Sequence, residues 1–528
     1  MKPLNINGND LKLEELREVC EAARPVALDA AARAAMERAR GTVEQQLAGN
    51  KVAYAVNTGV GKLSDVRILP EQIRELQLNL IRSHCVGVGE PLSEAETRAM
   101  MLLRANSMAK GHSGVRPLIV ETLCKMLEKG VHPVIPSQGS VGASGDLAPL
   151  AHLAAVLIGE GLAVYQGKTL TGAEAMKAAG LTPVVLEAKE AISLINGTQA
   201  MLAVGALSLL AAETLVDSAD VLGAMSLDAL KGTDAAFDER IHRARPHPGQ
   251  MKSATNLRRM LEGGSAIRES HRDCGRVQDA YSLRCIPQVH GAVRDALAWC
   301  RQVFEIEMNS AVDNPLVFPG SSGASAGEPV SHLDQRSNEE RALSSDVIIS
   351  GGNFHGEPVA FALDFLAIAL TALAGISERR LERMVNPALS EGLPSFLAPG
   401  AGLNSGFMMA QVTAAALVSE NKVYAHPASA DSITTSGNKE DYVSMGMTAA
   451  IKLKRVVANA TNVLAIEAIA AAQALDFLAP LKSSTRIEKA KVAVRKVCPP
   501  VDKDRALSDD FARTAAAITK GNLRAALS

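Results

Sequence analysis

The chain has 528 residues, of which 47% are hydrophobic and 21% are charged, and its formal net charge is −2. This is ordinary globular composition, so it excludes a disordered chain, and the near-neutral charge excludes a strongly basic nucleic-acid binder and any general attraction to anionic membranes. Aromatic residues make up only 3% of the chain, which argues against an aromatic platform for single-stranded nucleic acid.

The seven cysteines predict a reducing compartment. Their number is odd and no two form a Cys-x-x-Cys pair, so a disulfide framework or a zinc site is not indicated. The first residues, Met1 to Asn5, contain no apolar signal region. We therefore expect a cytoplasmic protein without a metal ion.

Helix signals dominate the chain from its N-terminal third onward. Apolar residues recur at helical spacing over 71–81, and Ser93 with Glu96 forms a capping-box pattern at the start of another helix. The segment that begins at Asp146 carries Pro149 in its first turn, where proline is tolerated, and it meets stop signals at 159–161.

Three later stretches are apolar on nearly every face: 200–225, 359–376 and 463–481. Each contains acidic residues, which a membrane span would avoid, so we interpret them as central helices of a large bundle whose remaining apolar surface is covered by oligomer contacts. The predicted fold is all-α. A smaller, mostly helical N-terminal domain (1–200) precedes a central bundle of long parallel and antiparallel helices (201–528), with a flexible insertion at 319–345 rich in glycine and serine.

The most informative segment runs from Gly139 to His152 and reads GSVGASGDLAPLAH. Within it, Ala143, Ser144 and Gly145 are suited to ring closure. The nitrogen of a glycine can approach the carbonyl carbon two residues earlier because no Cβ obstructs the bend, and the serine hydroxyl can leave as water. By composition alone, the same residues equally describe a small-residue turn that caps the following helix.

The full string resembles that of the aromatic amino-acid ammonia-lyase family, in which Ala-Ser-Gly cyclises into the electrophile 4-methylidene-imidazol-5-one (MIO). The resemblance extends in order along nearly the whole chain. The other matching segments are 54–62, 83–84, 104–106, 111–117, 194–200, 276–288, 307–309, 313–315, 350–356, 405–408, 419–422 and 438–441.

Within this family the chain is most similar to members that act on histidine. The resemblance implies a carbon–nitrogen lyase that converts L-histidine to trans-urocanate and ammonia, with MIO formed from Ala143, Ser144 and Gly145 and no external cofactor. It also implies a homotetramer whose active sites are shared between subunits, with no nucleic acid or membrane as partner. Whether the electrophile captures the substrate amine or the imidazole ring stays open.

The resemblance also assigns catalytic and carboxylate-binding roles. Tyr54, in a glycine-bearing segment suited to a lid, would be the general base, and Tyr281 a second catalytic tyrosine. Asn196 and Gln278 would hydrogen-bond the electrophile and the substrate carboxylate, and Arg284 would clamp that carboxylate through paired hydrogen bonds. Residues 278, 281 and 284 recur every three positions, which fits one side of a helical turn and equally an ordinary helix surface.

Substrate choice is assigned to His84, Met408 and Glu440, and Phe354 is expected to pack on the electrophilic ring. A carboxylate at position 440 can hold an imidazole N–H, whereas a phenyl ring would leave its charge unpaired. Taken alone, His84 would be a satisfied core histidine, and its pairing with Glu440 is what suggests a substrate contact.

Two other hypotheses remain. One is a tyrosine ammonia-lyase or tyrosine 2,3-aminomutase that uses the same electrophile. The other is a helical scaffold without enzymatic activity, in which Ala143, Ser144 and Gly145 stay uncyclised.

Overall fold

The computed structural model describes residues 1–49, 56–320 and 347–527. These residues form two compact units. Unit 1 comprises Met1–Leu207, Gln302–Leu363 and Ala428–Ile451, and unit 2 comprises Ser208–Arg301, Asp364–Pro427 and Lys452–Ser528. Most of the predicted insertion at 319–345 lies outside the described residues.

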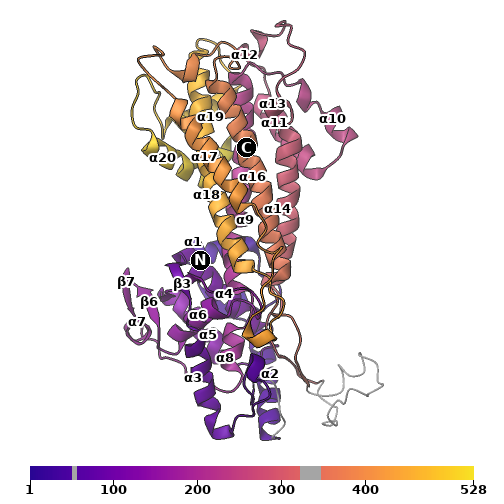
Figure 1. Cartoon of the computed structure of the whole chain (residues 1–528), viewed down its shortest axis with the longest axis vertical. Helices are drawn as coiled ribbons and strands as arrows, with labels where there is room; N and C mark the ends of the chain where they lie inside the picture. Colours follow the sequence, from indigo (N-terminus) through magenta and orange to yellow (C-terminus); the bar gives the residue numbers. More distant parts are fainter. Residues whose placement is uncertain (50–55, 321–346, 528) are drawn as a thin grey trace. The chain divides into compact units, whose positions relative to one another are not determined.

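Unit 1 is mainly helical, with short strands between the helices (Figure 1). Its own helices are α1 (Leu13–Glu21), α2 (Ala30–Ala48), α3 (Ile73–His84), α4 (Glu94–Ala109), α5 (Pro117–Lys129), α6 (Leu147–Leu157), α7 (Gly172–Ala178) and α8 (Glu190–Ile195). Its strands are β1 (Leu4–Ile6), β2 (Val26–Leu28), β3 (Val88–Pro91), β4 (His132–Pro133), β5 (Pro136–Gln138), β6 (Leu162–Tyr165), β7 (Lys168–Thr171), β8 (Leu316–Phe318) and β9 (Val347–Ile349).

The strands of unit 1 form small separate sheets. β1 pairs with β2 in parallel, whereas β3–β5, β4–β6–β7 and β8–β9 are antiparallel. In the three-stranded sheet Ala163 lies opposite both Pro133 and Leu170. These sheets only connect helices, so the fold is all-α, as predicted.

Unit 2 has helices of its own, which are α10 (Glu239–Ala244), α11 (Pro248–Leu261), α12 (Ala266–Glu269), α13 (Tyr281–Arg284), α17 (Met408–Tyr424), α19 (Thr485–Arg495) and α20 (Ser508–Thr519). Four longer helices contribute residues to both units: α9 (Gln199–Ala229), α14 (Ile286–Met308), α16 (Glu357–Val385) and α18 (Gly446–Phe477). The first break between the units follows Leu207, and unit 1 also takes in 302–363 and 428–451. The predicted domains 1–200 and 201–528 stay a prediction.

Three of the long helices contain the apolar stretches identified in the sequence. α9, α16 and α18 are long and apolar enough to cross a membrane by length and composition, and 83%, 61% and 78% of their most apolar windows are buried inside the protein. The acidic residues that interrupt them have partners in unit 2. Asp220 of α9 is bound by Arg294 and His290 of α14, and Glu467 of α18 is bound by Arg380 of α16.

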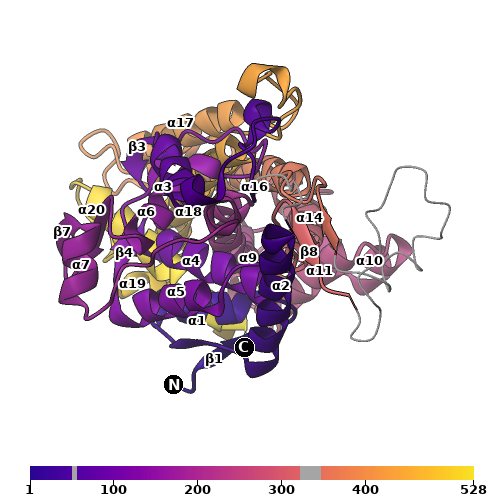
Figure 2. The same cartoon turned by 90° about the horizontal axis from the view of Figure 1, so that it is seen from below.

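The core of unit 1 centres on α4, which is buried along almost its entire length. Its start is fixed by the predicted capping box, in which the Ser93 hydroxyl accepts from the Glu96 N–H and the Glu96 carboxylate accepts from the Ser93 N–H. α4 packs against α1 and α5 (Figure 2). This buried helix supplies Arg104, which anchors the candidate site described below.

Candidate active site

The Ala143-Ser144-Gly145 segment forms a tight turn between β5 and α6, and α6 covers Leu147–Leu157 as the sequence predicted. Gly145 has a φ of +74°, in the left-handed region, and a Cβ at this position would collide with the carbonyl oxygen of Gly197. Residues 145 and 197 form an isolated parallel bridge. Only glycine can therefore occupy position 145 without displacing the neighbouring chain.

Asp146 ties this turn to the start of α9. Its N–H donates to the Gly197 carbonyl at 2.6 Å, and its buried carboxylate accepts from the Ser140 hydroxyl and the Met201 N–H, each at 2.8 Å. Burial raises the pKa of Asp146 to about 6, although these hydrogen bonds oppose the rise. The carboxylate is thus buried away from water, where its hydrogen bonds hold the turn in place.

Asn196 lies directly beside Ser144. Its side-chain Nδ2 donates to the Ser144 carbonyl oxygen at 3.1 Å. Its Oδ1 is buried and has no hydrogen-bond partner among the described residues. The carboxamide thus polarises the Ser144 carbonyl and leaves one acceptor unsatisfied, which an amine or ammonium group could occupy.

Arg104 fixes the segment that carries Asn196. Its fully buried guanidinium donates through Nη1 to the Asn196 carbonyl at 3.0 Å, to Gln199 Oε1 at 2.8 Å and to the Val312 carbonyl at 3.1 Å. Burial lowers the pKa of Arg104 to about 10, and the negative charge of Asp313 opposes the drop. The sequence analysis placed Arg104 in a matching segment but gave it no role, and spacing alone does not distinguish it from Arg98, the other buried arginine of α4.

Glu440 reaches Ser144 from a distant part of the chain. Glu440 Oε1 accepts from the Ser144 hydroxyl at 2.8 Å, whereas Oε2 accepts from Thr435 Oγ1 at 2.7 Å and Ser436 Oγ at 2.8 Å. The Thr435 N–H also donates to the Glu440 carbonyl at 2.8 Å. One carboxylate oxygen is therefore held by the local turn and the other is aimed at the serine hydroxyl.

His84, the last residue of α3, is close enough to Glu440 to feel its charge. Burial lowers the pKa of His84, and both a hydrogen bond to the Leu80 carbonyl and the negative charge of Glu440 partly oppose that drop. Its Nδ1 lies 2.8 Å from the Leu80 oxygen and 3.1 Å from Ser83 Oγ. Unit 1 thus brings Ser144, Asn196, Glu440 and His84 into one polar cluster.

Two further segments of unit 1 flank the turn. The Gly142 carbonyl accepts from the Gly356 N–H at 3.4 Å and from Ser444 Oγ at 3.2 Å, and the Met445 N–H donates to Val141 at 2.8 Å. Phe354 is half-buried two residues before Gly356. The structure places Phe354 in a segment that reaches the turn, and its packing on a ring remains a prediction.

Gln278, Tyr281, Arg284 and Met408 belong to unit 2. Tyr281 is 71% exposed, and the Arg284 guanidinium carbon lies 4.5 Å from the centre of its ring. Arg284 Nε is buried and has no hydrogen-bond partner among the described residues. Gln278 is exposed and precedes α13, so the helical turn that spacing suggested contains only Tyr281 and Arg284, while Met408 begins α17.

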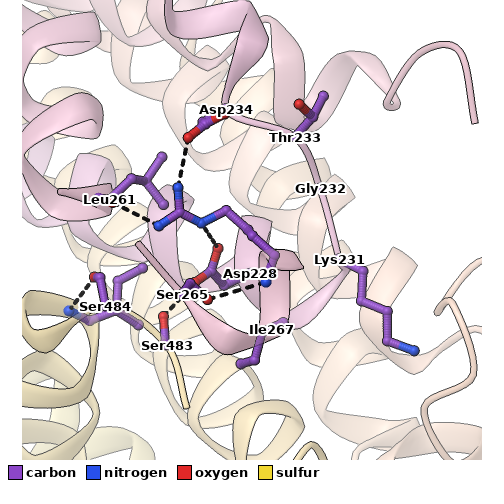
Figure 3. Close-up of polar contacts among 12 residues, drawn as sticks. Asp228, Lys231, Gly232, Thr233, Asp234, Leu261, Ser265, Ile267, Ser483 and Ser484 are labelled. Atoms are coloured by element: carbon purple, nitrogen blue, oxygen red, sulfur yellow. Dashed lines mark hydrogen bonds and ion pairs between the residues drawn. The ribbon is translucent and has the colours of Figure 1, made fainter. Parts of the chain in front are cut away.

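The segment before α13 is tied by a hydrogen bond to the loop that follows α9. The Thr233 N–H donates to Asp279 Oδ2 at 2.7 Å. Arg268 binds Asp234 Oδ2 and the Leu261 carbonyl at 2.7 Å each and Asp228 Oδ1 at 3.2 Å (Figure 3). Apart from Asp228, these residues border a cavity of about 510 Å³. The bond from Thr233 holds Asp279, the residue that follows Gln278, against this loop.

Tyr54 lies outside the described residues. Sequence reasoning missed Thr435 and Ser436, since hydroxyl residues in a loop carry no signal of which carboxylate they will bind. It also gave Asp146 no role beyond the start of a helix.

Among the residues that the structure describes, no group of three or more histidine, cysteine, aspartate or glutamate side chains could hold a metal ion.

The turn fits the cyclisation chemistry inferred from the sequence. Within the described part of the chain, neither the N–H of Gly145 nor the carbonyl of Ala143 takes part in a hydrogen bond. These are the two groups that must join, and neither has to give up a partner. The space that a Cβ on residue 145 would fill is occupied by Gly197, which keeps the bend closed.

Comparisons with known proteins match nearly the whole chain to one family. The sequence model of the family described as aromatic amino acid lyase matches residues 11–496. The chain is 69% identical over 526 residues to the histidine ammonia-lyase of Koribacter versatilis (strain Ellin345), covering 100% of this chain and 99% of that protein. It is 53% identical to the histidine ammonia-lyase of Sorangium cellulosum (strain So ce56), with 98% of each chain covered.

Comparison with solved structures also finds a histidine ammonia-lyase, together with an aminomutase. The crystal structure of histidine ammonia-lyase from Trypanosoma cruzi superposes with a TM-score of 0.88 at 41% identity, covering 99% of this chain and 95% of that one. Tyrosine aminomutase from Streptomyces globisporus superposes with a TM-score of 0.90 at 38% identity, covering 99% and 98%. The structural neighbours therefore include both ammonia-lyases and aminomutases.

Proposed function

Because the chain belongs to the aromatic amino acid lyase family, we propose that it is a histidine ammonia-lyase that converts L-histidine to trans-urocanate and ammonia. The observation that carries this proposal is the position of Ser144, whose carbonyl is bound by Asn196 and whose hydroxyl is bound by Glu440. The identity of 69% to a histidine ammonia-lyase over the whole chain supports histidine as the substrate.

We propose that Ala143, Ser144 and Gly145 cyclise to MIO without an external cofactor. The free N–H of Gly145 and the free carbonyl of Ala143 support this. MIO supplies a carbon electrophile, which no ordinary side chain offers and which activates an otherwise poor amine leaving group. Asn196 stabilises negative charge on the neighbouring carbonyl oxygen because its N–H already points there.

Glu440 and His84 select the substrate ring in this proposal. Glu440 accepts the imidazole N–H of histidine, and His84 lies near enough to complete a polar pocket. Since burial lowers the pKa of His84, this residue is neutral at neutral pH and can both donate and accept a hydrogen bond. A phenyl or phenol ring in this position would leave the Glu440 carboxylate without a donor.

The remaining site residues keep the roles that the family resemblance gives them. Arg284 binds the substrate carboxylate. Its buried Nε has no hydrogen-bond partner among the described residues, which supports this role because an anion could fill that position. Gln278 assists Arg284 in holding that carboxylate. Tyr54 removes the β-proton and Tyr281 acts as the second catalytic tyrosine, while Phe354 and Met408 shape the pocket.

We also propose that the protein is a cytoplasmic homotetramer with shared active sites. The high exposure of Tyr281, a residue with an assigned catalytic role, supports coverage by another subunit. Exposed apolar side chains on α16, such as Phe365 and Ile368, give such an interface an apolar surface. All seven cysteines are free, which supports a reducing compartment.

The test combines an intact-mass measurement with the Ser144→Ala variant. The wild-type chain should be lighter than its sequence by two water molecules and should form urocanate from histidine. Ser144→Ala cannot form the methylidene group, so turnover should fall on the order of 10³-fold or more while the helical content is unchanged. Ser310→Ala is the control, because among the described residues that hydroxyl bonds only the Ile306 carbonyl of α14, the helix that ends just before it.

Substrate profiling distinguishes the alternatives. Urocanate formation with no product from tyrosine supports the proposal, whereas release of β-tyrosine would identify an aminomutase like the structural neighbour from Streptomyces globisporus. A wild-type chain of unmodified mass and without activity would instead support a non-enzymatic helical protein.

A further inference from the structure

We propose that Glu440 also catalyses formation of the electrophile itself, by moving the proton that lets the Ser144 hydroxyl leave as water. This inference rests on the proposed function, since it assumes that residues 143–145 cyclise. It assigns Glu440 a task in the uncyclised chain that precedes any contact with substrate.

The first argument is the contact itself. In the uncyclised chain Glu440 Oε1 is 2.8 Å from Ser144 Oγ, although the two residues are 296 positions apart in sequence. The chain thus brings a carboxylate to the one hydroxyl that must be expelled. A substrate-binding role does not require that contact, because the substrate ring would arrive only after the hydroxyl has gone.

The second argument is the fixed orientation of the carboxylate. Oε2 accepts from both Thr435 Oγ1 and Ser436 Oγ, so Oε1 alone faces Ser144. Three hydroxyl groups donate to this one carboxylate, and a carboxylate oxygen can accept a proton. Glu440 therefore starts as a base placed next to the hydroxyl that will leave.

The third argument is Asn196, which prepares the carbon that must lose its proton. Its Nδ2 donates to the Ser144 carbonyl oxygen at 3.1 Å. Removing the Cα proton of Ser144 places negative charge on that oxygen, so a donor already aimed at it stabilises the developing charge. Asn196 and Glu440 thus act on the two ends of the same elimination.

The step balances without any external reactant. In ring closure, the Gly145 nitrogen bonds to the Ala143 carbonyl carbon, and that carbonyl oxygen leaves as water with the protons of the Gly145 and Ser144 N–H groups. In the elimination, Glu440 takes the Ser144 Cα proton and the Cα–Cβ double bond forms. The Cβ–Oγ bond breaks, and Oγ leaves as a second water after taking the proton from Glu440. The carboxylate ends as it began.

The geometry permits this transfer. Cα and Oγ of Ser144 are separated by only two bonds, so an oxygen in hydrogen-bond contact with Oγ can reach the Cα proton by a small rotation of the Glu440 side chain. Proton transfer by a positioned carboxylate contributes typically about 10²- to 10⁴-fold to a rate. Loss of this group should therefore leave Ser144 unreacted in most of the purified chains.

The experiment measures the mass of the purified full-length protein and of the fragment that contains residues 143–145. Wild type should lack two waters. Glu440→Gln keeps the shape of the side chain but cannot carry the proton, so most chains should retain the water of Ser144. His84→Leu is the matched control: it removes another residue of the proposed substrate pocket that makes no hydrogen bond to Ser144, and it should lose both waters completely.

A second variant tests the orientation of Glu440 without changing the carboxylate. Thr435→Val with Ser436→Ala frees Oε2, and we expect a mixture of dehydrated and undehydrated chains with unchanged circular dichroism. Complete loss of both waters in a folded Glu440→Gln protein would overturn the proposal. If Glu440→Gln fails to fold, complete dehydration of the Thr435→Val, Ser436→Ala protein would overturn it instead.

These outcomes are separable from those of the proposed function. If wild type itself retains both waters, the proposal that the chain makes its own electrophile fails. If wild type and Glu440→Gln both lose two waters, the ammonia-lyase proposal stands and Glu440 acts on substrate alone.

Discussion

Ser144 is held from two sides by groups of opposite character. Asn196 donates to its carbonyl, and Glu440 accepts from its hydroxyl. The donor withdraws electron density from the carbonyl, while the acceptor can take up a proton. This arrangement distinguishes the turn from the ordinary helix-capping turn that composition alone suggested.

The Asn196 donor gives a prediction about turnover. We expect Asn196→Ala to lower kcat/KM for histidine by about 10²- to 10³-fold, because one preorganised hydrogen bond to a developing oxyanion is lost. Urocanate absorbance gives the rate. Intact mass gives the fraction of chains that lack two waters, and dividing the rate by this fraction corrects for chains without the electrophile. A corrected kcat/KM within a few-fold of wild type would show that Asn196 does not act in turnover of histidine.

Sequence reasoning identified most of these residues through a resemblance, and the residues alone did not suffice. His84 and Glu440 are separated by hundreds of positions, so nothing in local spacing pairs them, yet the charge of Glu440 acts on His84 in the structure. Thr435 and Ser436 could not be predicted, since their function depends on a turn that brings them to Glu440 Oε2.

At the scale of elements, the active turn depends on the contact between two glycines on different segments. A Cβ on Gly145 would collide with Gly197, and a Cβ on Gly197 would collide with Gln199 and Arg104. Asp146 holds the pair together by bonding both Gly197 and the start of α9. The start of α6 was predictable from Asp146 and Pro149. The role of Gly197 was not, because it follows from a long-range approach of backbones.

Asp146 gives a prediction about stability against pH. Its pKa rises from 3.8 to about 6 on folding, so the folded chain binds the proton more tightly than the unfolded chain. The stability that the protonated form contributes is complete below about pH 4 and is lost as the pH rises toward 6, by about 1 to 3 kcal/mol in total.

The measurement compares Ser144→Ala with Ser144→Ala, Asp146→Asn, so that neither chain can form the methylidene group. Denaturant unfolding gives the free energy of unfolding of each protein from pH 4 to pH 7. As the pH rises, the protein with Asp146 should lose stability relative to the asparagine variant, so the difference between them should shrink or reverse. Parallel curves would mean that Asp146 keeps its ordinary pKa.

At the scale of the whole molecule, the long helices were the most predictable feature. The stretches 200–225 and 359–376 lie within α9 and α16, because uninterrupted apolar residues fit long buried helices. Of the stretch 463–481, residues 463–477 are the last part of α18 and residues 478–481 follow its end. The helix begins earlier, at Gly446, where polar residues obscure the pattern. The division into units was not predictable, since it depends on returns of the chain at 302–363 and 428–451.

The exposed apolar residues of α16 give a prediction about assembly. Phe365 and Ile368 are each 45% exposed. We expect Phe365→Glu with Ile368→Glu to break the proposed tetramer, because two charges on an apolar interface cannot be desolvated cheaply, and activity should fall with it. Light scattering after size exclusion gives the mass of the assembly. Leu162→Glu, on an exposed hairpin strand, is the control, and an intact tetramer in the α16 variant would place the interface elsewhere.

The separation between Ser144 and its carboxylate partner has a consequence for how the protein is made. Residue 440 leaves the ribosome long after residue 144, since 296 positions lie between them. A nascent chain therefore carries a harmless serine throughout most of its synthesis. In the proposal that Glu440 moves the proton, the reactive carbon arises only after translation has passed residue 440 and the partner segment has docked, when the pocket around it can form.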